Sequence, residues 1–400
     1  MTTTAPEDVV LVAAARTPHG RLNGAFATVS AIDLGAAAIR GALERGAIDA
    51  SAVDLVIMGN VLQAGLGQAP ARQAAIAAGI GWDVPAVTIN TVCLSALTSI
   101  VDGARRIRSG EVDVVVAGGM ESMTQAPHLL RGQRAGWVYG DVTAVDSMAH
   151  DGLSDAWSHE AMGLDTERRT ADHPASREEQ DAVAARSHRL AAQARDAGVL
   201  AREIVPVTVK GRRGDIVVTD DEGIRPDTTP ERLAALRPAF APDGTLTAGN
   251  SSTINDGAAA VVLARRSVAD EKGWTVLATL RSAAEVAGPS PALAPQPGNA
   301  VLRALATEGW QLEDLDLLEI NEAFAAVAVH SVRQLGVPID RVNVHGGAIS
   351  LGHPLGASGA RLVVHLAHEL ASRGSGRAVA ALCGGTGQGA ALLLEAATVS

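Results

Sequence analysis

Aromatic side chains are scarce in this sequence of 400 residues: they make up 2% of it, although 47% of the residues are hydrophobic. A core for a chain of this length must therefore be built from Ala, Val, Leu and Ile. These small side chains and the 42 glycines favour helices that pack closely on a sheet and are joined by tight turns. The composition predicts an aliphatic α/β fold.

Cysteine is nearly absent, and only Cys93 and Cys383 are present. Secreted proteins that depend on disulfides use more cysteines, so the low count indicates a reducing compartment. Residues 1–8 lack the basic segment and apolar run of a secretory signal. Apolar runs elsewhere are as short as strands and far below the length of a membrane span. We expect a soluble, cytoplasmic protein.

An excess of basic residues is also missing, because 44 acidic residues face 33 Lys and Arg and the net charge is −11. Nucleic acids and anionic membranes normally bind to a basic surface. The charge therefore argues against both as partners. It leaves room for a local basic patch that binds one phosphorylated small molecule.

What the sequence does contain is an alternation of strand-like and helix-like segments. Continuous apolar runs are typical of strands buried on both faces, and apolar residues recurring every three or four positions indicate helices. In the first section we predict strands at 9–14, 55–58, 87–90 and 112–117 and helices at 33–43, 69–78 and from about Leu94. The second section predicts strands at 276–280, 315–320, 342–344, 378–382 and 390–395 and helices at 300–306, from about Ala323 and at 357–370.

The two sections differ in the position of their last strand. In the second section a glycine turn, 384–389, joins the strand at 378–382 to its return strand. In the first section the strand ends at Gly118 and Gly119, and the matching return strand, 257–263, follows much later. We predict a duplicated strand–helix unit with an insertion. The expected parts are an N-terminal half (1–123, completed by 247–272), a loop domain (124–246, with a helix at 178–193) and a C-terminal half (273–400).

Cys93 lies at a predicted junction between a strand and a helix. A cysteine in the first turn of a helix faces unpaired backbone N–H groups and the positive end of the helix dipole. Both favour the thiolate, which would make this sulfur a nucleophile. The alternative is a buried cysteine that fills a small gap in the core.

His353 lies in a glycine-rich segment between His345 and Gly359. Such a segment can hold the backbone in conformations that other residues rarely adopt. An imidazole there could take a proton from a thiol or donate to a developing oxyanion. The alternative is a histidine that binds the carbonyl groups of a turn.

Cys383 precedes a glycine-rich turn that contains Gly385. Glycines let the backbone approach a ligand and leave N–H groups free for an oxyanion, and a second thiol can act as acid and base toward carbon. The alternatives are a core cysteine before a hairpin and a phosphate-binding turn, although the Lys-Ser/Thr of a P-loop is missing.

Asn321 and Glu322 follow a predicted strand and begin a predicted helix. Asn321 could cap that helix, which is the commoner role, or hold a water that points into a site. His365 and His368 have helical spacing for a metal, but no carboxylate-rich cluster accompanies them. We expect no metal site.

Taken together, these segments resemble the thiolase family, and the resemblance covers nearly the whole chain. Its four ordered blocks surround Cys93, Asn321 with Glu322, His353 and Cys383, and 115–123 and 247–257 are also similar to thiolases. The resemblance implies two βαβαβαββ halves in a layered α/β/α/β/α body with a loop domain. It also implies an acyltransferase that works through an acyl-cysteine, needs no cofactor besides the coenzyme A of its substrates and products, and assembles as a homodimer or homotetramer.

The resemblance also implies a role for each site residue. Cys93 would be acylated, His353 would activate it, and Cys383 would exchange a proton with the carbon of acetyl-CoA. His353 and a water on Asn321 would form one oxyanion hole, and the N–H groups of Cys93 and Gly385 the other. Pantetheine would pass Met162, Ser252 and Phe324, and the candidates for binding the phosphates of coenzyme A are Lys210, Arg212, Arg213 and Arg225.

Four positions depart from the family pattern. Ala96 and Thr386 replace glycines, and His345 replaces a common asparagine. The methyl group of Ala96 could narrow the space beside Cys93 or shift its helix. Ala161 stands where acetoacetyl-CoA thiolases often carry a histidine before Met-Gly, which weakens the assignment to short acyl chains.

The main interpretation is an acetyl-CoA C-acetyltransferase that forms acetoacetyl-CoA from two acetyl-CoA, or runs the reverse thiolysis. The first alternative is a degradative 3-ketoacyl-CoA thiolase of fatty acid metabolism that acts on longer chains. A decarboxylating ketoacyl synthase would carry a second catalytic His or Asn and no Cys383. A protein of another class, an inactive thiolase-like acyl-CoA binder, is the remaining alternative.

Overall fold

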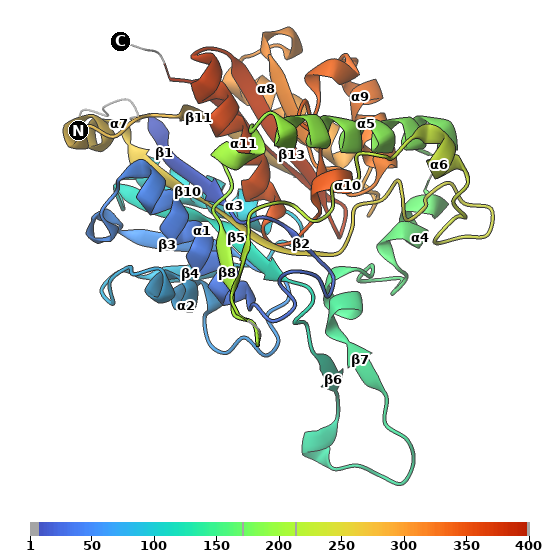
Figure 1. Cartoon of the computed structure of the whole chain (residues 1–400). Helices are drawn as coiled ribbons and strands as arrows, with labels where there is room; N and C mark the ends of the chain where they lie inside the picture. The colour runs from blue at the N-terminus through green and yellow to red at the C-terminus, as the bar shows by residue number, and fades with distance from the viewer. Residues whose placement is uncertain (1–7, 170–171, 213, 398–400) are drawn as a thin grey trace.

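The computed structural model describes residues 8–169, 172–212 and 214–397, and within them ten strands form one sheet (Figure 1). The strand order is β12-β13-β14-β11-β1-β10-β5-β3-β4, and short β2 pairs with β10. Their bounds are β1 Val9–Arg16, β2 Gly20–Arg21, β3 Leu55–Gly59, β4 Ala86–Ile89, β5 Val114–Ser122, β10 Asn255–Arg265, β11 Ala278–Ala287, β12 Leu317–Ile320, β13 Arg377–Gly384 and β14 Gln388–Ala396.

The helices pack against the strands and form with them the layers expected from the sequence. One aliphatic core contains α3 (Ser95–Arg108) and α11 (Ser358–Arg373) together with strands of both halves, so these helices form a central layer. A second core places α1 (Ala31–Gly46) and α2 (Pro70–Ala77) on the outer face of the N-terminal half. A third places α8 (Gln296–Glu308) and α9 (Ala325–Leu335) on the outer face of the C-terminal half. The predicted α/β/α/β/α body is confirmed.

The two halves share a pattern of strand pairing. β10 pairs antiparallel with β5, and β14 pairs antiparallel with β13, so the return strand of the first half does come from beyond residue 246 as predicted. The prediction that the preceding strand ends at Gly118 and Gly119 is wrong, because β5 runs through both glycines to Ser122. The strand predicted at 342–344 is not formed: these residues make only two isolated bridges, Leu318 to Val342 and Val344 to Gly346. We propose the division into two halves and a loop domain with the boundaries given above.

The inserted segment contains short strands and helices and one long helix, α5. They are β6 (His128–Leu130), β7 (Ala144–Asp146), α4 (Met162–Arg168), α5 (Arg177–Asp196), β8 (Val207–Val209), β9 (Ile216–Val218) and α6 (Pro230–Ala234). The β6–β7 hairpin extends away from the body (Figure 1). α5 begins with a capping box of Ser176 and Glu179, which satisfies N–H groups at its start. The remaining helices are α7 (Arg266–Lys272) and α10 (Ala348–Leu351).

A buried ionic cluster ties the inserted segment to β1. The Arg16 guanidinium, which is fully buried, donates to both carboxylate oxygens of Asp221 at 2.7 and 2.9 Å and to Glu203 at 2.7 Å. Glu203 also contacts Nδ1 of His365 on α11 at 2.9 Å. The cluster therefore joins three parts of the chain that are distant in sequence.

Among the described residues, no helix combines the length and apolar character that crossing a bilayer requires.

Candidate active site

Segments far apart in the sequence meet at the carboxyl ends of the strands, where ligands commonly bind in α/β folds. Cys93 follows β4, His353 lies between α10 and α11, and Cys383 is near the end of β13. All three line one cavity of about 60 Å³, together with Gly385. Asn321, directly after β12, joins them because its Nδ2 lies 3.4 Å from Nε2 of His353. The structure thus brings together the five residues that the sequence indicated as catalytic.

Cys93 is presented by a strained turn. Val92 adopts a positive φ of 53°, which is unusual for a residue branched at Cβ. The turn is held by Ser95, whose Oγ donates to the carbonyl of Val92 at 2.6 Å and accepts from the N–H of Thr91 at 2.9 Å. Strain of this kind persists only where the surroundings enforce it, and it is frequent at functional sites. The turn leaves Cys93 partly exposed to the cavity.

The electrostatics of Cys93 differ from the expectation. Burial raises the pKa of its thiol to about 11, and hydrogen bonds from the backbone N–H groups of Gly385 and Cys93 only partly oppose this. The residue also precedes α3, which begins at Ser95, and does not lie in its first turn. The stabilisation of a thiolate by the helix end, which the sequence indicated, is therefore outweighed by desolvation. A base must remove the proton.

His353 is held on both its backbone and its ring. Its N–H donates to Oδ1 of Asn255 at 3.1 Å, and Gly352 before it has a φ of 98°, where a Cβ would meet the Asn255 side chain. Nδ1 lies 2.6 Å from Oγ of Ser358. Burial, with Arg361 and His19 nearby, lowers the pKa of His353 to about 3. The imidazole is therefore neutral near pH 7 and can accept a proton.

Cys383 is buried, and two glycines allow its strand end to approach the Cys93 turn. A Cβ at Gly384 would lie 2.7 Å from Cγ of Leu94, and one at Gly385 would lie 3.3 Å from Cγ1 of Val92. Burial, and secondarily the neighbouring Cys93, raises the pKa of the Cys383 thiol far above its ordinary value. Cys383 is therefore protonated at rest and suited to donate a proton.

Asn321 does not cap a helix, because α9 begins only at Ala325. Its buried Oδ1 has no hydrogen-bond partner among the described residues, so it can accept from a water or a substrate group. Glu322 has a structural place: it accepts from Ser187 at 2.7 Å, Asn343 at 2.9 Å and the N–H of Ile349 at 3.1 Å.

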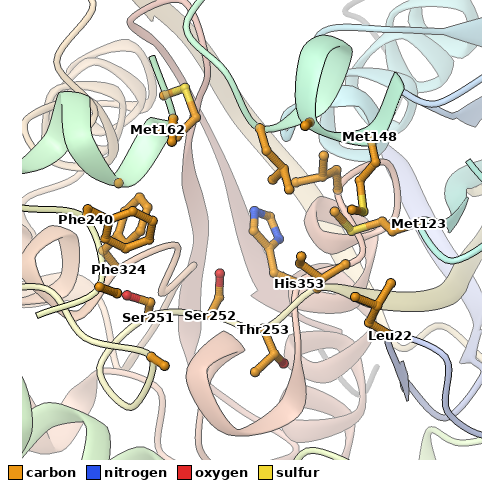
Figure 2. Close-up of a pocket in the computed structure, with 18 of the residues that line it drawn as sticks. Leu22, Met123, Met148, Met162, Phe240, Ser251, Ser252, Thr253, Phe324 and His353 are labelled. Carbon is orange, nitrogen blue, oxygen red and sulfur yellow. The ribbon is translucent and has the colours of Figure 1, made fainter. Parts of the chain in front are cut away.

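A larger cavity of about 680 Å³ opens beside the catalytic group and shares Met162, Ser252, Phe324 and His353 with it. Figure 2 shows His353 between two sides of this cavity. Met162, Phe240 and Phe324 lie on one side, which we call the aromatic side. On the other side, which we call the methionine side, lie Leu22, Met123 and Met148.

The basic residues suggested for phosphate binding are not among the residues that line either cavity. Arg225 is exposed, Lys210 pairs with Asp215 at 2.6 Å, Arg212 is exposed, and Arg213 lies outside the described residues. Their role stays a prediction. Among the described lining residues, Arg21 at the larger cavity is the basic one, and sequence reasoning did not identify it.

The departures from the family pattern have local explanations. Ala96 is fully buried and does not line the cavities; a Cβ at Gly119 of β5 would lie 2.8 Å from its methyl group, so it faces the sheet and does not narrow the site. Thr386 takes a φ of 72° where glycine is usual, and its Oγ1 accepts from Gln388 at 2.7 Å. His345 lies 3.1 Å from His365, ring nitrogen to ring nitrogen. His365 also contacts Glu203.

Sequence reasoning missed Asn255, Ser358 and the residues of the methionine side. Asn255 and Ser358 stand inside segments that the sequence had marked, but nothing in their local pattern indicates a contact with His353. Met123 directly follows β5, and its glycine-containing strand was the available signal.

Comparisons with known proteins agree with this architecture. Residues 9–267 match the thiolase N-terminal domain and residues 274–396 match the thiolase C-terminal domain. The chain is 55% identical over 388 residues to a probable acetyl-CoA acetyltransferase of Mycobacterium tuberculosis, covering 97% of this chain and 99% of that protein. It is 49% identical over 390 residues to an acetyl-CoA acetyltransferase of Pseudomonas aeruginosa, with 97% and 99% covered.

Solved structures are equally similar. The crystal structure of the Bacillus anthracis acetyl-CoA acetyltransferase superposes with a TM-score of 0.96 at 40% identity, covering 99% of this chain and 100% of that one. The crystal structure of human mitochondrial 3-ketoacyl-CoA thiolase superposes with a TM-score of 0.95 at 40% identity, covering 98% of this chain and 100% of that one. Both thiolase domains match, over residues 9–267 and 274–396, and a relative is 55% identical over 97% of the chain. The chain therefore belongs to the thiolase family.

Proposed function

We propose that this protein is an acetyl-CoA C-acetyltransferase that reversibly condenses two acetyl-CoA to acetoacetyl-CoA and CoA. The observation that carries the proposal is the meeting of Cys93, His353, Cys383 and Gly385 around one cavity. The names of the relatives, acetyl-CoA acetyltransferases at 46–55% identity, support the substrate. No cofactor beyond the coenzyme A of the substrates enters the proposal.

In the first step His353 takes the proton of Cys93 at Nε2, and the thiolate attacks the thioester carbonyl. The N–H groups of Cys93 and Gly385, which face this sulfur, would bind the oxyanion that forms. The leaving thiolate of CoA takes its proton from the Cys383 thiol, so that acetyl-Cys93, the protonated His353 and the Cys383 thiolate remain. A neutral imidazole and a protonated thiol are the starting states that this exchange requires.

Cys383 serves the carbon chemistry. In thiolysis, its thiol gives a proton to the carbanion of the departing acetyl-CoA and then recovers one from the incoming CoA. In condensation, the Cys383 thiolate removes the proton from the second acetyl-CoA. The enolate oxygen would be bound by Nε2–H of His353 and a water on Asn321, since the proton taken from Cys93 is the one that the imidazole then donates.

The test is the acyl-enzyme itself. Incubation with acetyl-CoA should add one acetyl group to the peptide that contains Cys93, detected by mass spectrometry. Cys383→Ser should still be acetylated but fail to form acetoacetyl-CoA, and Cys93→Ala should not be labelled. An unlabelled wild-type protein would refute the proposal and favour an inactive acyl-CoA binder.

A second candidate function, degradation of longer 3-ketoacyl-CoA, is favoured by the methionine side of the larger cavity. Cys93 packs against an aliphatic cluster that includes Met123, Met148, Leu153 and Leu355, so an apolar path leads from the sulfur toward this side. Each methylene buried there contributes about 0.8 kcal/mol. Pantetheine would then occupy the aromatic side, past Met162, Ser252 and Phe324.

Comparing kcat/KM for thiolysis of acetoacetyl-CoA and of a longer 3-ketoacyl-CoA separates the two functions. A strong preference for the longer substrate would replace the acetyltransferase assignment and place the enzyme in fatty acid metabolism. Preference for acetoacetyl-CoA would retain it.

We further propose a homodimer or homotetramer in the cytoplasm. β4 is an edge strand with Val87 exposed, Trp82 nearby is 79% exposed, and the β6–β7 hairpin exposes Trp137, Val138 and Tyr139. Apolar side chains of this size on an edge strand and an extended hairpin are typical of assembly surfaces. Light scattering after gel filtration should give a dimer or tetramer, and a monomer would contradict this.

A further inference from the structure

We infer that Ser358 is a positioning residue that fixes which nitrogen of His353 carries the proton. The inference rests on the proposed role of His353 as the base for Cys93. It concerns a hydroxyl that neither the family pattern nor the cavity lining assigns to the reaction.

The geometry around the hydroxyl supplies the argument. Oγ of Ser358 lies 2.8 Å from the carbonyl oxygen of Pro354 and 2.6 Å from Nδ1 of His353. A serine hydroxyl has one proton, and a carbonyl oxygen can only accept. With that proton donated to Pro354, the contact with His353 needs a proton from the ring. Nδ1 therefore donates to Ser358.

The other side of the ring agrees with this assignment. Nδ2 of Asn321 lies 3.4 Å from Nε2 of His353, as a weak donor to an unprotonated nitrogen would. The imidazole is neutral, so a proton on Nδ1 leaves the lone pair on Nε2. The three hydrogen bonds then share one direction: Asn321 donates to Nε2, Nδ1 donates to Ser358, and Ser358 donates to the carbonyl of Pro354. Nε2 is the nitrogen left to accept the proton of Cys93.

Ser358 also stabilises the product of that transfer. Once Nε2 is protonated the ring is a buried cation, and its Nδ1–H needs an acceptor. Ser358 is buried at the start of α11 and lines neither cavity, so it contacts the ring and not the substrate. Its loss should slow proton transfer without weakening acyl-CoA binding.

The kinetic test uses Ser358→Ala, Ser358→Thr and, as a matched control, Ser99→Ala. Ser99 is another buried serine whose hydroxyl binds a backbone carbonyl, Gly118 at 2.6 Å, but it does not contact His353. Because a hydrogen bond to a charged group is lost, Ser358→Ala should slow acetylation of Cys93 about 10- to 100-fold. KM for acetyl-CoA should stay within about threefold, Ser358→Thr should restore the rate, and Ser99→Ala should match the wild type.

A spectroscopic test needs no variant of Ser358. In protein labelled with 15N-histidine, the His353 signals, assigned by their loss in His353→Gln, should show a protonated Nδ1 and an unprotonated Nε2. A proton on Nε2 would overturn the inference, as would a Ser358→Ala variant that acetylates Cys93 at the wild-type rate. If Ser358→Ala does not fold, the spectrum decides. Absence of acetylation in the wild type would instead refute the proposed function.

Discussion

At the scale of the residue, the site pairs two groups that are both neutral at rest. Burial raises the pKa of Cys93 to about 11 and lowers that of His353 to about 3. Both shifts have the same cause, since a low-dielectric environment disfavours each charged form. A thiolate–imidazolium pair therefore does not persist before substrate binds. In the mechanism proposed above, proton transfer accompanies the attack on the thioester carbonyl, which receives the charge.

A pH profile of Cys93 reactivity follows from these shifts. In the free enzyme, alkylation of Cys93 by iodoacetamide should rise continuously with pH through the alkaline range, because its pKa of about 11 lies above the ~8.5 of an unperturbed thiol. Mass spectrometry of the Cys93 peptide at pH 6 to 10 measures the rate. His353→Gln should leave the profile almost unchanged. A rate that is already maximal at pH 7 would show that the resting state is an ion pair.

The sequence identified the chemical groups better than their environment. Cys93, His353 and Cys383 could be identified because the short sequence segments around them resemble those of a known family. Desolvation outweighs the helix-end effect expected at Cys93, and it was not foreseen because helix ends are visible in a sequence whereas desolvation depends on packing. Asn255 and the methionine side were missed for the same reason: their contacts arise from segments far away in the chain.

At the scale of the element, glycines set how closely strands approach the site. A Cβ at Gly119 of β5 would overlap the carbonyl oxygen of Gly356, in the turn that leads from His353 into α11, and would lie 2.8 Å from the Ala96 methyl group. Gly118 and Gly119 therefore do not end the strand: Gly119 lets α3 and the His353 segment lie directly on it, whereas a Cβ at Gly118 would meet the backbone of Ala259 in β10. This packing fixes Cys93 relative to His353.

Gly119→Ala should consequently damage both stability and activity. Because the added methyl group meets backbone atoms that cannot rotate away, we expect a loss of about 1–3 kcal/mol in the free energy of unfolding. Urea unfolding and the rate of Cys93 acetylation measure the two effects. Gly103→Ala is the control, since its Cβ would lie 3.0 Å from the Val115 side chain and the substitution favours the helix. Equal stability of Gly119→Ala and wild type would refute this account.

The elements themselves were largely predictable. Apart from 342–344, which form no strand, the buried strands and amphipathic helices of both halves appear near their expected positions, because each is marked by an apolar run or by helical periodicity. The strands β6 to β9 were not predicted, since three-residue strands that are partly exposed carry no such pattern. The bounds of β5 and β11 shifted by several residues, because pairing with neighbours, and not composition, decides where a strand ends.

At the scale of the whole molecule, the cluster of Arg16, Glu203 and Asp221 connects the inserted segment to the sheet. Burial alone would raise the pKa of Glu203, but Arg16 and His365 outweigh it and hold that pKa below its usual value. Burial likewise opposes ionisation of Asp221, and Arg16 and His19 lower its pKa. Carboxyl groups with a lowered folded pKa contribute stability above their unfolded pKa of about 4 and lose it as the pH falls further.

Arg16→Met should therefore destabilise the protein most at neutral pH. Two buried carboxylates would lose their partner, at a cost of about 3–5 kcal/mol at pH 7. As the pH falls from 7 toward 4, the unpaired buried carboxyl groups of the variant protonate whereas those of the wild type stay ionised, so the difference from wild type should shrink. Urea unfolding at pH 7 and pH 4 measures it. Arg105→Met, which breaks the exposed pair with Glu285, should cost less than about 1 kcal/mol. A difference that grows toward acid pH would contradict the linkage.

The long separation in sequence between Cys93 and β13 has a consequence for the newly made protein. Cys383 lies in β13 and Gly385 in the turn that follows, so a ribosome must add about 290 residues after Cys93 before that residue can meet them. Until then, the Cys93 turn lacks the N–H of Gly385 and the proton donor of the second thiol. With the roles proposed above for Cys383 and Gly385, a chain that has not yet formed the β13–β14 hairpin should not turn over acetyl-CoA.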